Sequence, residues 1–198
     1  DFRSSNSFID NSVRENYLFN SKINGIEDTD FILLIGSNPR FEATMLNARI
    51  RKAYLKNNTK IYSLNDVGDL TYDYKNFDGK TQKIKEIFEN KDEISNDIIQ
   101  SKNPMIILGE SFLNLKSAIY LFNLIKNFLS QNNKFSNNWN PLNILYSDAG
   151  TVGSIDLDII CKTNNLIEEI DQNKYEIIYL LGQDNLKFKK KDEFIIYQ

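Results

Sequence analysis

One unit recurs along the chain: a short apolar run, a glycine turn and then an amphipathic segment. The first run, Phe31–Ile35, is too short for a helix and rich in branched side chains, which is typical of a strand buried on both faces. The sequence Gly-Ser-Asn-Pro at residues 36–39 supplies a turn, a helix N-cap and a proline at the first helical position. Apolar residues then recur every three or four positions to Tyr54, which predicts one continuous helix.

The same reasoning extends to the rest of the chain. Apolar runs at 105–108 and 176–181 are closed by Gly109 and Gly182, as the first is closed by Gly36. We expect strands at 31–35, 59–64, 105–108, 176–181 and 193–197. We expect helices at 17–26, 39–54, 81–90, 94–99, 113–129 and 164–171, the helix at 113–129 being long and packed on two sides. Residues 67–79 and 131–140 are expected to be loops, and residues 142–160 short helical turns and loop.

Strands that alternate with helices predict a parallel sheet. The expected fold is therefore α/β, a doubly wound, mostly parallel sheet with helices on both faces. We divide the chain into an N-terminal segment at 1–29 and one α/β domain at 30–198. Because the sequence stops directly after a predicted strand, we expect this domain to be part of a larger subunit.

Composition argues against two classes of function, nucleic-acid binding and membrane spanning. The chain has 198 residues, 41% hydrophobic and 26% charged, with a net charge of −3, which argues against a nucleic-acid footprint. Its apolar runs are far shorter than the roughly 20 residues that span a bilayer, and the sequence starts without a signal-peptide pattern. We therefore expect no direct membrane span.

Few side chains here could carry metal or redox chemistry. The sequence has no histidine and one cysteine, Cys161, so it cannot ligate a four-cysteine iron–sulfur cluster and offers little to zinc. The apolar neighbours of Cys161 indicate a small core residue. The basic run at Lys187–Lys191 is expected to be a solvated connection between two strands.

The glycine turns are the remaining candidates for a site. Ligands of open parallel sheets bind beyond the carboxyl ends of the strands, and the helix N-terminus at Asn38, Pro39 and Arg40 has free N–H groups suited to phosphate. The other interpretation is that Gly36 and Asn38 only make a turn and cap a helix. The dinucleotide and P-loop fingerprints are absent, and Ser37 has no histidine to act as its base. We assign no catalytic, cofactor-binding or metal-ligating residue.

A family resemblance rests on two adjoining motifs, Gly-Ser-Asn-Pro-Arg-Phe-Glu-Ala at 36–43 and Asn-Ala-Arg-Ile-Arg-Lys at 47–52. Supporting matches are Tyr-Leu-Phe-Asn at 17–20, Asp-Leu-Thr-Tyr-Asp-Tyr at 69–74, Pro-Met-Ile-Ile-Leu-Gly at 104–109, Trp-Asn at 139–140 and Phe-Ile-Ile-Tyr-Gln at 194–198. These residues resemble the C-terminal, molybdopterin-oxidoreductase-like part of the 75 kDa iron–sulfur subunit of respiratory complex I, the NADH:ubiquinone oxidoreductase.

The resemblance implies that electron transfer and structural support belong to different parts of the family's subunit. In that family the N-terminal part holds the clusters, and the C-terminal part is a molybdenum-enzyme fold that has lost its cofactor. It implies a truncated molybdopterin-oxidoreductase-like domain that is non-catalytic and carries no cofactor, with iron–sulfur clusters and FMN in partner chains. The partners it implies are other peripheral-arm subunits of complex I, including the cluster-bearing part of the same subunit and the flavoprotein subunits. The implied location is the matrix-facing arm of the mitochondrial inner-membrane complex.

Two other hypotheses remain open. The chain could be a fragment of an active molybdopterin-dependent oxidoreductase, which would need a metal ligand and a second phosphate loop; Gln183, Asp184 and Asn185 make a poor one. It could instead be a free-standing small-molecule binding module, with a pocket at the three glycine turns. If it is a scaffold, its exposed apolar side chains should be buried by neighbouring chains.

Overall fold

The computed structural model describes residues 10–159, 166–183, 187–189 and 191–198, and divides the chain into two compact units, Asp1–Leu157 and Asp158–Gln198. Each unit is described by itself. The expected domain boundary at residue 30 stays a prediction.

The first unit is built on a parallel sheet. Its strands are β1 (Phe31–Ile35), β2 (Lys60–Leu64), β3 (Lys75–Phe77), β4 (Pro104–Gly109) and β5 (Leu142–Leu145). The strand order is β3-β2-β1-β4-β5, and every neighbouring pair is parallel. This arrangement is the doubly wound α/β fold that the sequence predicts.

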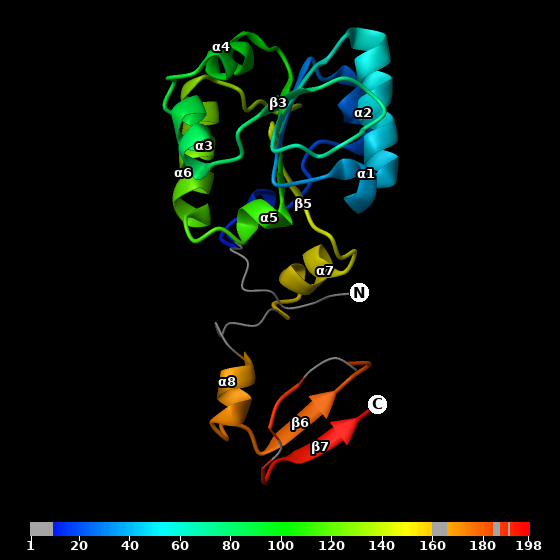
Figure 1. Cartoon of the computed structure of the whole chain (residues 1–198), viewed down its shortest axis with the longest axis vertical. Coiled ribbons are helices and arrows are strands. Elements are labelled where there is room, and N and C mark those ends of the chain that lie inside the picture. The colour runs from blue at the N-terminus through cyan, green and yellow to red at the C-terminus, as the bar shows by residue number, and fades with distance from the viewer. Residues whose placement is uncertain (1–9, 160–165, 184–186, 190) are drawn as a thin grey trace. The chain divides into compact units, whose positions relative to one another are not determined.

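Helices cover both faces of the sheet. They are α1 (Pro39–Glu42), α2 (Thr44–Asn57), α3 (Thr81–Phe88), α4 (Glu93–Gln100), α5 (Glu110–Leu113), α6 (Ala118–Gln131) and α7 (Thr151–Asp156), with 3₁₀ turns η1 (Arg14–Asn16) and η2 (Ile23–Asp28). Figure 1 shows α3, α4 and α6 on one side of the strands and α1 and α2 on the other. In the described part of the chain, no helix is both long and apolar enough to cross a membrane.

Alternate side chains of β1 feed two separate cores. Phe31, Leu33 and Ile35 pack with residues of α3, α4 and α6, whereas Ile32 and Leu34 pack with residues of α2 and η2. All five β1 side chains are buried, as expected of a central strand in a parallel sheet. The apolar run at 31–35 is thus a strand buried on both faces, as predicted.

The predicted helices differ from the observed ones in three places. The helix expected at 39–54 is broken at Ala43, whose φ of −151° separates α1 from α2. The helix expected at 113–129 begins only at Ala118, and Ile119, expected to pack, is exposed. In place of the helix expected at 17–26 there is the turn η2, preceded by Phe19, which forms an isolated bridge with Asn143.

Two strands lie where the sequence predicts irregular structure. β5 occupies part of the stretch 142–160, and β3 lies inside the loop expected at 67–79. The outer edge of β5 is covered by the N-terminal segment: the Ile144 N–H donates to the Leu18 carbonyl at 2.9 Å, and Asn20 Nδ2 donates to the Leu142 carbonyl at 2.7 Å. The N-terminal segment therefore protects an edge strand from pairing with another chain.

The second unit contains α8 (Leu166–Asp171), β6 (Ile177–Leu180) and β7 (Phe194–Tyr197). β6 and β7 form a two-stranded parallel sheet of their own, so the third apolar run is not a strand of the five-stranded sheet. The basic run lies in the connection between these two strands, as expected, and Lys187 and Lys189 are exposed there. Both predicted strands and the short helix are confirmed.

Candidate functional site at the carboxyl ends of β1 and β4

The strand order places a topological switch point between β1 and β4. The chain turns to β2 on one side of β1 and later to β4 on the other, and Ile35 lies opposite Leu108 in register. Open α/β sheets bind ligands in the crevice beyond this point. Gly36 follows β1 and Gly109 ends β4, so the structure brings two of the three glycine turns together at the classical ligand position.

The crevice between these two turns is closed by backbone contacts. A Cβ built on Gly109 would overlap the carbonyl oxygen of Gly36 and lie 2.5 Å from Cβ of Ser37. Gly36 has a φ of +65°, and a Cβ there would lie 2.6 Å from the backbone nitrogen of Phe112, whose side chain is buried. These glycines let two turns touch where a ligand-binding α/β protein keeps space.

The predicted helix start at residues 38–40 is correct in detail. Asn38 caps α1 by accepting from the Arg40 N–H at 3.2 Å, and Pro39 is the first helical residue. The phosphate interpretation finds no support there, because α1 has only four residues and Arg40 is already engaged. Its guanidinium pairs with the Asp69 carboxylate at 2.6 Å and donates to the Asp69 carbonyl.

Two buried polar atoms near this turn have no hydrogen-bond partner among the described residues: Oγ of Ser37 and Oε2 of Glu42. Ser37 is only 5% exposed. Burial raises the pKa of Glu42, and the nearby charge of Glu110 raises it further. Burial thus makes the neutral form of Glu42 more favourable than it is in a free carboxyl group, and among the described residues no base is hydrogen-bonded to the Ser37 hydroxyl.

The polar side chains that follow in the motif bind other parts of this chain. Buried Asn47 donates to the Leu70 carbonyl at 3.0 Å and accepts from the Tyr72 hydroxyl at 2.7 Å. Arg49 and Lys52 both pair with the carboxylate of Glu27, Lys52 at 2.8 Å. The sequence alone did not predict this pairing of Glu27 with two cations of the following helix.

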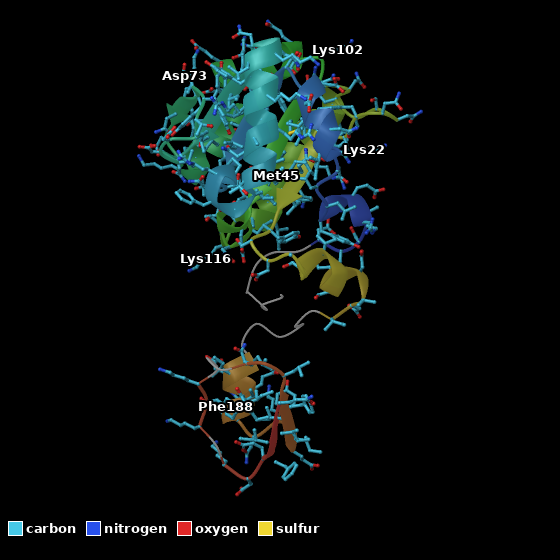
Figure 2. The ribbon with its side chains drawn as sticks, turned by 90° about the vertical axis from the view of Figure 1, so that its right-hand side faces the viewer. Lys22, Met45, Asp73, Lys102, Lys116 and Phe188 are labelled. Carbon is cyan, nitrogen blue, oxygen red and sulfur yellow. The ribbon has the colours of Figure 1, made fainter. Side chains whose placement is uncertain are left out.

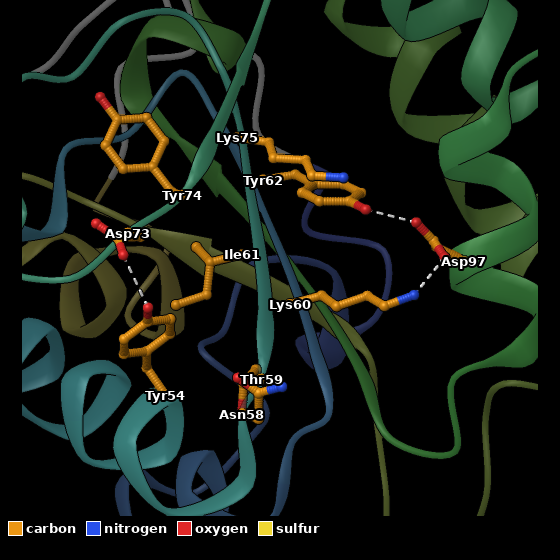
Figure 3. A pocket seen from close by; sticks show the side chains of 10 residues that line it. All are labelled: Tyr54, Asn58, Thr59, Lys60, Ile61, Tyr62, Asp73, Tyr74, Lys75 and Asp97. Carbon is orange, nitrogen blue, oxygen red and sulfur yellow. Dashed lines mark hydrogen bonds and ion pairs between the residues drawn. The ribbon is translucent and has the colours of Figure 1, made fainter.

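Figure 3 shows a pocket of about 450 Å³ beside β2, near the end where that strand starts. Two of its charged groups, Lys60 and Asp97, are paired with each other. Asp97 accepts from Lys60 at 2.7 Å and from the Tyr62 hydroxyl at 2.6 Å, and Tyr54 donates to Asp73 at 3.1 Å. The pocket lies at the amino end of β2, opposite to the end that binds ligands in open α/β sheets.

A second hollow, a groove of about 650 Å³, is largely apolar. It runs beside the break between α1 and α2 and includes Phe41, Met45, Leu46, Ile23 and Leu145. Phe41 and Met45 are 81% and 71% exposed, unusual for large apolar side chains. An exposed apolar groove is typical of a contact surface for another polypeptide.

Metal-binding residues were not expected, and that assignment stays a prediction. Within the described ranges, histidine, cysteine, aspartate and glutamate form no group of three that could hold a metal ion. Cys161 lies outside the described residues, as do Asp184 and Asn185 of the poor second phosphate loop. Gly182, with a φ of +59°, donates its N–H to the carbonyl of Gln198 at 2.7 Å in the second unit.

Comparison with known proteins identifies the family. The sequence profile of the molybdopterin oxidoreductase family matches residues 1–198. The chain is 38% identical over 94% of its length to the mitochondrial NADH-ubiquinone oxidoreductase 78 kDa subunit of Candida albicans, covering 25% of that protein. It is 37% identical over 93% of its length to the NADH-ubiquinone oxidoreductase 75 kDa subunit of Reclinomonas americana, covering 27%.

A plant protein matches over the same extent. It is the mitochondrial NADH dehydrogenase [ubiquinone] iron-sulfur protein 1 of Solanum tuberosum, 31% identical over 94% of this chain and 25% of its own length. The chain thus spans about a quarter of the length of the curated relatives it matches. It belongs to the molybdopterin oxidoreductase family, and its relatives there are the 75/78 kDa subunits of NADH-ubiquinone oxidoreductase.

Proposed function

We propose that this chain is a non-catalytic structural component of the peripheral arm of mitochondrial respiratory complex I. It would support electron transfer from NADH to ubiquinone that other chains carry out. The relatives named as NADH-ubiquinone oxidoreductase subunits support assembly into this complex. The closed crevice at Gly36 and Gly109 supports the non-catalytic role and is the observation that carries it.

The contact between the turns after β1 and β4 supports the absence of a pterin dinucleotide from this crevice. The turns after β1 and β4 touch, and the backbone of buried Phe112 lies against Gly36. Asn38, Arg40, Asn47, Arg49 and Lys52 each bind another segment of this chain. We therefore propose that the motif holds the fold together and that the chain carries no cofactor.

The electron carriers in this proposal are located in partner chains. Iron–sulfur clusters would lie in the cluster-bearing part of the same kind of subunit and FMN in the flavoprotein subunits. The chain would sit in the matrix-facing arm; two of the relatives cited above are named mitochondrial. The exposed apolar groove beside Phe41 and Met45 supports burial against one of these neighbours.

Native purification in mild detergent tests the proposal. The complete assembly that carries this chain is isolated, its proteins are identified by mass spectrometry, and iron and molybdenum are measured in the same fraction. We expect co-migration with flavoprotein and quinone-module subunits, with iron present and molybdenum at background. As a control, an antibody against a flavoprotein subunit should recover this chain in the same ratio to that subunit as in the purified assembly.

Two outcomes would contradict the proposal. Stoichiometric molybdenum on a small complex would favour the alternative, a fragment of an active molybdopterin-dependent oxidoreductase. A free monomer with none of these subunits would favour the small-molecule binding module.

A further inference from the structure

Glu42 places a carboxyl group in the wall of the apolar groove beside the break between α1 and α2. Phe41 and Met45, which also line this groove, are 81% and 71% exposed. Ile23 of η2 adds a third large apolar side chain that is exposed. The groove therefore combines one acidic group with apolar surface that is still in contact with water.

The hydrogen bonds of the Glu42 carboxyl group are incomplete. The backbone N–H of Asn38 donates one hydrogen bond to it. The atom Oε2 is buried and has no hydrogen-bond partner among the described residues. Because a buried acceptor without a partner destabilises a fold, this oxygen indicates a hydrogen-bond donor that comes from outside these residues.

The charge around Glu42 is negative. Burial raises the pKa of Glu42, and the charge of Glu110 at the start of α5 raises it further. Neither of these two carboxyl groups has an ion pair within the described ranges, whereas Glu27, Asp92 and Asp97 each pair with a lysine or an arginine. A cation beside Glu42 would therefore offset both the burial and the repulsion.

The lysine of the groove itself does not supply this cation. Lys22 lines the groove and is exposed, and in the described part of the chain it forms no ion pair with Glu42. Figure 2 labels Lys22 and Met45 on the side of the first unit that faces the viewer. Water and salt screen an exposed charge more than a partly buried one, so Lys22 should repel an incoming cation less than Glu42 and Glu110 attract it.

We propose that this groove is the docking site for a segment of a partner polypeptide that carries a lysine or an arginine next to a large apolar side chain. The basic group pairs with Glu42, and the apolar side chain packs against Phe41 and Met45. The inference rests on the proposed function, because it requires an assembly partner, and it deepens that function by stating the chemistry of the segment that binds.

The groove suits a polypeptide better than a small molecule. A small-molecule site encloses most of its ligand, whereas side chains as exposed as Phe41 and Met45 are typical of a contact between proteins. Lysine and arginine also match the groove along their length. Their aliphatic stems can cover apolar surface while the charged head reaches a carboxyl group.

A charge reversal in the full chain tests the ion pair. The chain with Glu42→Lys is expressed in place of the natural copy, and the fraction recovered in the intact native assembly is measured by quantitative mass spectrometry. We expect incorporation to fall roughly tenfold or more, because two cations then face each other in the contact. The matched control, Glu15→Lys, reverses an exposed acid that does not line the groove and should be incorporated like the wild type.

A second variant, Glu42→Gln, separates binding from folding. The amide oxygen can still accept from the Asn38 N–H, and the buried charge is gone. The chain alone should therefore be at least as stable toward urea as the wild type, while its incorporation falls about threefold or more. A loss of stability in the isolated chain that accounts for the loss of incorporation would overturn the proposal, because Glu42 would then serve only the fold.

Photo-crosslinking identifies the segment that binds. Benzoylphenylalanine replaces Met45 in the full chain, and the crosslinked peptides of the intact assembly are identified by mass spectrometry. We expect a peptide of another polypeptide with a lysine or an arginine within four residues of the crosslink. Exchanging that basic residue for glutamate should restore the incorporation of Glu42→Lys.

Four outcomes would overturn the proposal. They are a crosslink to this chain or to a second copy of it, a crosslinked segment without a basic residue, normal incorporation of Glu42→Lys, and a charge exchange that restores nothing. The identity of the other proteins in the assembly tests the proposed function separately. If the charge exchange restores incorporation in an assembly that lacks the complex I subunits, only the proposed function fails.

Discussion

At the scale of single residues, Gly109 and Asn47 are held by close contacts within the chain. Gly109 has an ordinary backbone conformation, with a φ of −92°, so its missing side chain serves only the close approach of Gly36. Asn47 is a buried amide whose carbonyl oxygen and amino group both have partners within the chain. Side chains fixed in this way are not available to a ligand, and substituting them should change stability.

Replacing Gly109 with alanine should destabilise the chain by about 2–3 kcal/mol, the upper range for overpacking a tight contact. The new Cβ meets the backbone of Gly36 and the Cβ of Ser37, which cannot rotate away. Urea unfolding of the full chain measures the effect. The matched control is Gly153→Ala in α7, where a Cβ meets nothing within 4 Å and helix propensity favours alanine, so its stability should stay equal or rise slightly. Equal effects of both substitutions would refute the close contact.

Asn47→Ala should cost about 2–3 kcal/mol, because it leaves the Leu70 carbonyl and the buried Tyr72 hydroxyl without their partner. Tyr72→Phe removes only the hydroxyl and should cost about 1 kcal/mol. The double variant should lose less stability than the sum of the two single losses, by a coupling energy of at least about 0.5 kcal/mol. Additive losses in a double-mutant cycle by urea unfolding would show that the two groups act independently.

At the scale of elements, periodicity predicted the helices and strands that have local signals. The α/β class, β1, β2, β4 and the N-cap at Asn38 were all readable from the sequence. β5 was missed because Leu142–Leu145 is short and carries a polar residue, Asn143, whose buried side chain bonds with distant Ser21 as well as with the carbonyl of Pro141. The break at Ala43 has no glycine or proline to mark it.

The closed crevice could not be predicted either. Local sequence gives two glycine turns, but their contact depends on β1 and β4 becoming neighbours and on Phe112 packing behind them. The resemblance to complex I supplied the absence of a cofactor as an expectation. The contact of backbone against backbone between the two turns is visible only in three dimensions.

The contact between η1 and α7 should make stability depend on pH in the acid range. Hydrogen bonds from Arg14 and then Tyr17 lower the pKa of Asp156 from 3.8 to about 2. The unfolded chain therefore binds more protons than the folded chain between these values, so the stabilisation is complete above about pH 4 and is lost toward about pH 2. Urea unfolding at several pH values should give a higher free energy of unfolding for the wild type than for Asp156→Asn at pH 5 to 7. The two free energies should converge near pH 2. A difference in free energy of unfolding that stays constant from pH 7 to pH 2 would contradict this link between stability and the protonation of Asp156.

At the scale of the whole molecule, the exposed apolar side chains are the features that a solitary protein does not explain. They occur in the groove of the first unit and, in the second, at Ile177, Tyr179 and Phe194, and single exposed apolar residues elsewhere are ordinary. Among the described residues, Oγ of Ser37 and Oε2 of Glu42 are buried without a hydrogen-bond partner, and each unit has large apolar side chains at its surface. Such a surface is expected of a component that completes its burial in an assembly.

The full chain made alone should consequently associate with itself as its concentration rises, and removing apolar surface at the groove should weaken that association. In Phe41→Ser/Met45→Ser, two side chains exposed at 81% and 71% are replaced by polar ones, and we expect an association constant about tenfold lower, since about 1.4 kcal/mol of apolar burial is lost. Met45 is labelled in Figure 2 near the start of α2. Sedimentation velocity over a concentration series measures the change.

The matched control is Leu55→Ser, which removes an equally exposed residue of the same helix that does not line the groove. It should leave association unchanged, because an isolated apolar side chain contributes little contact area. A monodisperse monomer at all concentrations, in the unsubstituted chain as in both variants, would count against a scaffold whose apolar surfaces await partners. Association lowered equally by Leu55→Ser would place the contact on α2 as a whole rather than at the groove.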